Sequence, residues 1–201
     1  MSFQHTVPKD DDFSRLLDKS LAWGACKSAL VPASKIMTRQ DLADLCDTCP
    51  NQGLAPSCPP QVGGPVQFRQ WQSTCHHALF LSMEVETAML LSASRSDVFQ
   101  MLHDLCAGLE AEAKTLGFSK AMAFAGGSCK AVFCSDQPNC MALKHTGDCP
   151  FPDRARPSMS GFGVDVAALI KTAGWENESF LEQKGISKTQ HSGLYGLILL
   201  G

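Results

Sequence analysis

Seven of the ten cysteines in this chain fall in two short stretches, and thiolates at such close spacing are typical metal ligands. The first stretch contains Cys46, Cys49 and Cys58, in the pattern C-x2-C-x8-C-P-P. The second contains Cys129, Cys134, Cys140 and Cys149, in the pattern C-x4-C-x5-C-x8-C-P. Both stretches are rich in Pro, Gly, Asn and Asp, which form loops that wrap around a bound metal. These seven cysteines are the predicted metal-binding and cofactor-binding residues.

The second group supplies four thiols, the number that holds a [4Fe–4S] cluster. Gly126 and Gly127 precede it and allow the backbone to approach a bulky cofactor closely. The proline after Cys149 stiffens the chain where it leaves the group. We therefore expect the loop at about 126–152 to form a complete [4Fe–4S] site by itself.

The first group, in the loop at about 46–60, supplies only three thiols. Either a remote cysteine completes a second [4Fe–4S] site, or one iron position remains open to substrate. The remaining cysteines are Cys26, Cys75 and Cys106. Cys106 lies near the apolar face of a predicted helix and is expected to belong to the core. His145, within the second group, is a further candidate ligand at either kind of site.

Zinc is the alternative metal. The C-x2-C pair at Cys46 and Cys49 also occurs in zinc sites, which take four nitrogen or sulfur ligands. The second group contains no such close pair, and this favours iron–sulfur. The chain has no G-x-S-x-G elbow, no Walker A lysine loop and no His-Glu-x-x-His motif. Common hydrolase, nucleotide-binding and metalloprotease sites are therefore not indicated.

Composition indicates the cellular compartment and excludes some classes of binding partner. The 201 residues, 44% of them hydrophobic, fit a single domain spanning 1–201. A net charge of −3 gives no basic surface for nucleic acid, and no apolar run is long enough to span a membrane. The first residues lack the basic and apolar regions of a signal peptide. We expect a cytoplasmic protein, where disulfides are rare and clustered thiols bind metal.

Hydrophobic periodicity predicts the elements that position these loops. Helices are expected at Asp10–Gly24, Asp97–Leu116 and Ser160–Thr172, with a short one that Thr38 and Asp41 cap and that ends at Cys46. Strands are expected at Ser28–Ile36, His77–Val85, Lys120–Ala125 and Leu194–Leu200, and Pro32 places the first at an edge. The segment Asn51–Pro65 is expected to be an irregular loop. The predicted fold class is α/β, an α+β sandwich in which helices cover one sheet and both cysteine loops lie at one end.

The spacing of several motifs also resembles a known family. The residues that carry this resemblance are Cys46-x2-Cys49, Ser57-Cys58-Pro59-Pro60, Gly126-Gly127-Ser128-Cys129, Cys149-x4-Arg154, Arg156-Pro157-Ser158-Met159 and Gly163-Val164-Asp165-Val166. Together, over roughly 22–175, they resemble the DUF2284 family of predicted metal-binding proteins of anaerobic bacteria and archaea. The resemblance implies cysteine-bound metal, foremost iron–sulfur, in a cytoplasmic anaerobic setting.

The sequence thus predicts an iron–sulfur protein with one or two [4Fe–4S] clusters that transfers electrons to or from a partner enzyme. The first alternative is a small iron–sulfur enzyme that binds substrate at the open iron of a three-cysteine cluster. The second is a zinc-stabilised interaction module.

Overall fold

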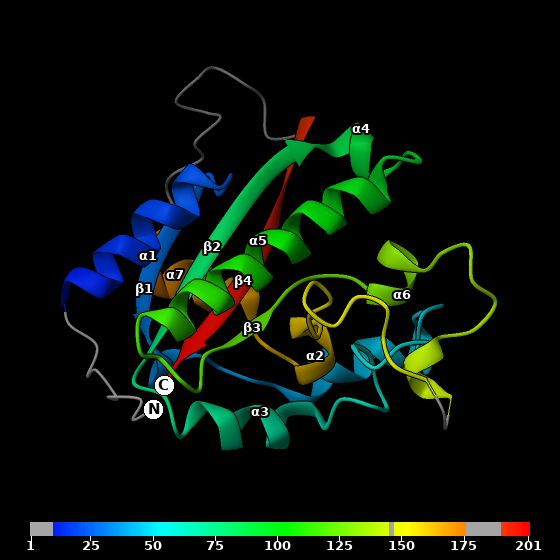
Figure 1. Cartoon of the computed structure of the whole chain (residues 1–201), viewed down its shortest axis with the longest axis horizontal. Coiled ribbons are helices and arrows are strands. Elements are labelled where there is room, and N and C mark those ends of the chain that lie inside the picture. The colour runs from blue at the N-terminus through cyan, green and yellow to red at the C-terminus, as the bar shows by residue number, and fades with distance from the viewer. Residues whose placement is uncertain (1–9, 145–146, 176–189) are drawn as a thin grey trace, which may run out of the picture.

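The computed structural model describes residues 10–144, 147–175 and 190–201, and its centre is a four-stranded antiparallel sheet (Figure 1). The strands are β1 (Lys27–Pro32), β2 (His77–Glu86), β3 (Met122–Phe124) and β4 (His191–Leu200). They lie in the order β1-β2-β4-β3, so β1 and β3 are the edge strands. The predicted α/β class and the edge position of the first strand are confirmed.

Helices cover both faces of the sheet because its two central strands alternate apolar side chains between the faces. Leu79 and Leu81 of β2 pack on one face with α1 (Asp10–Ala22) and α5 (Arg95–Thr115). Phe80 of β2 packs on the other face with α3 (Gly64–Gln72) and α7 (Val166–Thr172). The core is therefore two apolar layers separated by the sheet.

Helix α5 is the longest helix of the described chain and fits the periodicity that predicted it. Leu102, Leu105 and Leu109 are buried against the sheet, and each contributes roughly 1.5–3 kcal/mol by burial. Gly117, with φ of 100°, ends the helical segment in the left-handed conformation that glycine adopts without steric cost. This rigid helix runs beside the second cysteine loop (Figure 1).

The predicted cap of the helix before Cys46 is wrong. Helix α2 (Gln40–Asp44) begins after Arg39, and no side chain caps it. Thr38 instead pairs with Val164 in an isolated β-bridge, and its hydroxyl accepts a hydrogen bond from Arg69 at 3.0 Å. Asp41 pairs with Arg39 rather than reaching back to the helix start. Thr38 and Asp41 therefore contact other residues instead of capping the helix.

Other boundaries also differ from the prediction. The loop expected at Asn51–Pro65 ends at Gly64, where α3 begins with a proline in its first turn. The helix expected from Ser160 begins only at Val166, because Asp165 caps it by accepting a hydrogen bond from the Ala168 N–H at 2.9 Å. The first strand stops at Pro32, four residues early, and the third is shorter at both ends.

Short elements carry the cysteine loops at one end of the molecule (Figure 1). They are α2, η2 (Leu45–Thr48), α6 (Cys129–Phe133), η3 (Met141–Leu143) and η4 (Met159–Phe162). A further short helix, α4 (Thr87–Leu90), joins β2 to α5. Among the helices that the structure describes, none has the length and apolar character needed to cross a membrane.

Candidate metal centre

The three cysteines of the first group surround one side of a cavity. Cys46 lies in η2, Cys49 follows the end of that element, and the N–H of Cys58 closes a turn by donating to the Ala55 carbonyl at 3.1 Å. All three line a cavity of about 390 Å³. The prediction that these cysteines lie together is therefore consistent with the structure, whereas their binding of metal stays a prediction.

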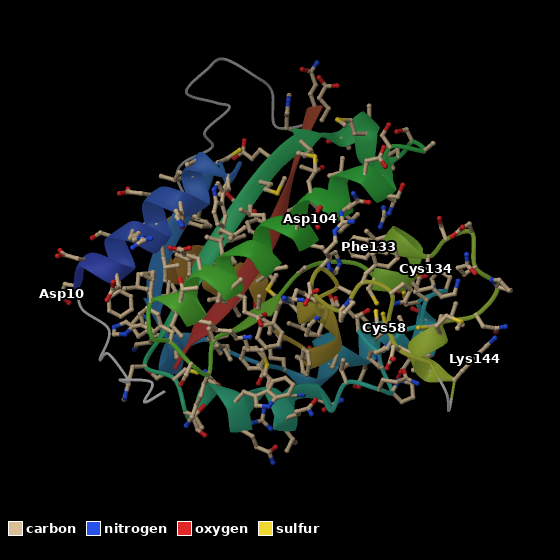
Figure 2. All side chains as sticks on the ribbon, viewed as in Figure 1. Asp10, Cys58, Asp104, Phe133, Cys134 and Lys144 are labelled. Carbon is tan, nitrogen blue, oxygen red and sulfur yellow. The ribbon has the colours of Figure 1, made fainter. Side chains whose placement is uncertain are left out.

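The second group is more extended. Cys129 is the first residue of α6, and Cys134 follows the end of this helix. Cys140 precedes η3, and Cys149 precedes the proline where the loop leaves the group. Cys129 is buried, whereas the other three are half-buried. Figure 2 shows Cys134 at the same end of the molecule as Cys58.

Cys58 and Cys129 join the two groups. Each is only 8% exposed, and the two pack with Ala55 in a small buried cluster separate from the sheet core. The N–H of Cys129 donates to the hydroxyl of Ser57 at 3.1 Å, and this hydroxyl lies 3.7 Å from the Cys58 sulfur. The two cysteine loops therefore form one region of the molecule.

An aromatic stack holds the second loop closed. Phe133, next to Cys134, stacks on Phe151, two residues beyond Cys149, with ring centroids 5.2 Å apart and an angle of 24° between the planes. Such offset stacks stabilise by ~0.5–1.5 kcal/mol beyond simple burial. The stack brings the chain segments at Cys134 and Cys149 together although 14 residues separate these cysteines in the sequence.

A bidentate ion pair fixes this stack to α5. The guanidinium of Arg154 donates to both carboxylate oxygens of Asp104 at 2.7 Å. The same guanidinium lies over the ring of Phe133 at 4.9 Å and over that of Phe151 at 5.9 Å. Because α5 is anchored in the core, this contact gives the second loop a rigid support.

A buried histidine on α5 supports the next part of the chain. His103 accepts a hydrogen bond at Nδ1 from the Arg156 N–H at 3.0 Å, so its neutral ring carries the proton on Nε2. Burial lowers the pKa of His103 to about 4, and the nearby Arg156 charge lowers the pKa further. The Arg156 guanidinium pairs with Glu110, also on α5, at 2.8 Å. His103 is therefore a structural residue, uncharged at neutral pH.

The remaining cysteines lie away from the two loops. Cys26 precedes β1, and its sulfur accepts a hydrogen bond from the Glu84 N–H at 3.4 Å. The Cys75 thiol donates to the Trp71 carbonyl at 3.5 Å. Cys106 is fully buried in α5, where burial raises the pKa of its thiol to about 12. The prediction that Cys106 belongs to the core is confirmed.

Burial and neighbouring thiols raise the pKa of two cysteines, Cys46 and Cys129. Burial raises the pKa of Cys46, and the nearby thiols of Cys49 and Cys58 raise it further. Burial also raises the pKa of Cys129, while hydrogen bonds to Ser57 lower it and Cys58 raises it again. A negative thiolate at one position therefore disfavours a second nearby, and a bound metal cation would relieve this repulsion.

The second group shows the same mutual effect. Burial raises the pKa of Cys134, followed in size by the effects of Cys149 and Cys140. Cys140 also raises the pKa of Cys129, by less than Cys58 does. Cys129 shares a buried cluster with Cys58 and borders a cavity with Cys149, so it lies between the two groups.

The seven thiols are soft donors, which both iron–sulfur clusters and zinc accept. Within the described ranges of the chain, no group of three or more His, Cys, Asp or Glu side chains is arranged to hold one metal ion. A zinc site needs four donors within about 2.3 Å of one centre. A cubane binds each of its four thiolates through a different iron, so its ligands lie further apart. His145 lies outside the described residues.

The cavity beside the first group is lined by two glycines that lie against the Phe99 ring and by a serine whose hydroxyl has no partner among the described residues. Gly126 and Gly127 line it, and a Cβ at either position would lie within 3.2 Å of the Phe99 ring. Ser128 also lines it, and its hydroxyl is buried with no hydrogen-bond partner in the described part of the chain. An unpaired buried hydroxyl costs ~1–3 kcal/mol, so a bound group with an acceptor would stabilise this site.

Several supporting residues were missed from the sequence. Ser57 was noted only as part of a motif, and His103, Asp104 and Glu110 were not singled out. A signal was available, because His103 and Glu110 are seven residues apart and so share one face of a helix otherwise buried by leucines. Buried polar side chains on such a face need hydrogen-bond or ion-pair partners. Here Arg156, seven residues after Cys149, supplies them.

A family model described as "Predicted metal-binding protein (DUF2284)" matches residues 29–200. The chain belongs to the DUF2284 family. The match includes both cysteine groups and extends beyond the predicted resemblance to the end of β4. Neither the curated proteins nor the solved structures include a match to this DUF2284 protein.

Proposed function

We propose that this DUF2284 protein binds iron–sulfur clusters through its seven clustered cysteines and transfers electrons to or from a partner enzyme. The observation that carries this proposal is the packing of Cys58 against Cys129, which unites the two cysteine groups in one region. Clusters bound there would be near neighbours, and electrons pass readily between near neighbours. The reduced thiols required would be maintained in the cytoplasm of an anaerobe.

Thiolate-only ligation favours iron–sulfur over other metals. Hard cations such as Mg²⁺ and Ca²⁺ take oxygen donors, whereas thiolates select zinc, copper(I) and iron–sulfur clusters. Two structural zinc ions would require eight donors, and the two groups supply seven thiols. A cubane accepts three thiolates and leaves one iron for another ligand.

The charges beside the two groups predict which cluster is reduced first. Lys130 lies within the second group and donates to the carbonyls of Cys134 at 3.3 Å and of Gln137 at 2.7 Å. Asp47 lies beside the first group and raises the pKa of Cys46. An added electron is more stable near a cation than near an anion. We therefore expect the cluster of the second group to have the higher reduction potential.

A redox titration of anaerobically purified protein, followed by electron paramagnetic resonance, tests this function. Two reversible one-electron steps are expected, and Lys130→Gln should lower the potential of the higher one. Lys114→Gln, which alters a lysine at the far end of α5, is the control and should change neither step. Irreversible bleaching on the first reduction would contradict the electron-transfer function.

The cavity favours a second candidate function, a small enzyme that binds substrate at an open iron. Cys46, Cys49 and Cys58 all line this cavity of about 390 Å³, which lies within the size range of small-molecule sites. Cyanide or a small thiol should then alter the resonance of the first cluster only. An unchanged signal would leave electron transfer as the function.

A further inference from the structure

The first cysteine group lacks a fourth thiol in its own loop, and one cysteine of the second group packs beside it. Cys26 lies before β1, Cys75 after α3 and Cys106 within α5. Cys129, although distant in sequence, packs in one small buried cluster with Cys58 and Ala55. The cysteine nearest to completing the first group therefore comes from the second.

Three contacts fix Cys129 beside Cys58. The two thiols share one buried cluster, where both are 8% exposed. The hydroxyl of Ser57 accepts from the Cys129 N–H at 3.1 Å and lies 3.7 Å from the Cys58 sulfur. The Ser57 carbonyl accepts from the Ser158 N–H at 3.1 Å, which ties this backbone to a third segment. A residue bonded on both sides holds its neighbours in a defined position.

The residue immediately before Cys129 also lies beside the first cysteine group. Ser128, immediately before it, lines the same cavity as Cys46, Cys49 and Cys58. A positive φ of 76° at Gly127 turns the chain at this point, and α6 then begins with Cys129. The backbone leading into Cys129 thus borders the cavity that Cys46, Cys49 and Cys58 line.

The other three cysteines are held together without Cys129. The stack of Phe133 on Phe151 joins the segments of Cys134 and Cys149. Lys130 of α6 donates to the carbonyls of Cys134 at 3.3 Å and of Gln137 at 2.7 Å, which holds the segment leading to Cys140 against this helix. Cys129 does border a second cavity with Cys149, so it lies at the junction of both groups. The thiol that shares its buried cluster, however, is that of Cys58.

We propose that Cys129 is the fourth ligand of the first cluster, with Cys46, Cys49 and Cys58, and that Cys134, Cys140 and Cys149 hold the second. This inference rests on the proposed iron–sulfur function. It replaces the expectation that the second group is complete by itself. The first cluster would be fully ligated by thiolates, and the iron without a thiolate would belong to the second. The exchangeable position would then lie away from the cavity at the first group.

Paired substitutions separate the two arrangements, because two ligands of one cluster have non-additive effects. Cys58→Ala and Cys129→Ala should each remove about half of the iron and sulfide, together with the same paramagnetic signal. The double variant Cys58→Ala/Cys129→Ala should lose no more than either single variant. Cys58→Ala/Cys149→Ala should lose nearly all. Cys26→Ala, outside both loops, is the control that should retain both clusters.

The reverse pattern would overturn the proposal. If Cys129→Ala/Cys149→Ala retains half of the iron while Cys58→Ala/Cys129→Ala loses all, Cys129 belongs to the second cluster. Loss of all iron in Cys58→Ala alone would show a single shared cluster, which also overturns it. A wild-type chain that holds zinc without sulfide would refute the iron–sulfur function. The zinc content of the same variants would then show which cysteines bind the same ion.

Discussion

The backbone N–H of Cys129 donates to the hydroxyl of Ser57 at 3.1 Å, a contact between residues 72 positions apart that joins the two cysteine loops. Ser57 immediately precedes Cys58, so this bond lies where the two cysteine groups meet. The arrangement of the proposed metal centre therefore depends on a serine that is not itself a metal ligand.

Replacement of Ser57 by alanine should loosen this junction. Ser57→Ala leaves the buried N–H of Cys129 without its acceptor, which costs ~1–3 kcal/mol in the free energy of unfolding. The bound clusters should also decay faster, as measured by loss of visible absorbance. Ser57→Thr retains a hydroxyl and should restore most of the stability. Ser20→Ala, at a buried serine in α1, is the control that should leave cluster decay unchanged.

The ion pair of Arg154 with Asp104 should affect the metal centre more than the fold. Both side chains are about 40% exposed, so the pair contributes less than ~1 kcal/mol to stability. Asp104→Asn should nevertheless release the Phe133 and Phe151 stack and speed iron loss to a chelator several-fold. Arg15→Gln removes the ion pair of an exposed arginine of α1 with Glu112 of α5 and is the control. Equal rates in both variants would contradict this positioning role.

The buried neutral His103 predicts acid destabilisation. Its pKa is lowered to about 4 in the folded chain, from 6.5 for an ordinary histidine. As pH falls below 6.5 the unfolded chain binds this proton first, so stability is complete above that pH and is lost toward pH 4. Between pH 7.5 and 5 the loss is about 2 kcal/mol. His103→Gln keeps an acceptor for the Arg156 N–H but does not titrate.

Denaturant unfolding of metal-free protein at several pH values measures this effect. The stability of the His103→Gln variant should fall less with acidification than that of the unsubstituted chain. Parallel pH profiles for the two proteins would show that another group is responsible.

The fold should depend only partly on the metal. The apolar cores on the two faces of the sheet are separate from the small cluster of Cys58 and Cys129. Chelated protein should therefore keep most of its helical circular dichroism, while the cysteine loops become sensitive to protease. Complete loss of the helical signal on chelation would show that the metal is required for folding.

Elements with strong local patterns could be predicted from the sequence. The continuous apolar run over His77–Val85 and the leucine spacing of Asp97–Leu116 each indicate their own element, a buried strand and a helix. Helix α3 was missed because its proline and glycine start resembles a loop. The cap at Thr38 failed because a distant partner, Arg69, competes for its hydroxyl.

In the candidate site, too, local sequence patterns could be predicted and contacts between distant segments could not. The two cysteine groups are evident from spacing alone, but the contact of Cys58 with Cys129 depends on how two loops meet in space. Likewise, Asp104 acquires its role only when Arg154 reaches it from a loop 50 residues away. Tertiary contacts between distant segments leave no periodic signal in a single sequence.

Analysis of iron, acid-labile sulfide and absorbance in anaerobically purified protein tests the central claim most directly. Two cubanes would give about eight irons and eight sulfides per chain, with a broad absorption near ~400 nm that bleaches on reduction. Alanine at all seven cysteines of the two groups should abolish both contents. A colourless chain that contains zinc and no sulfide would contradict the iron–sulfur account.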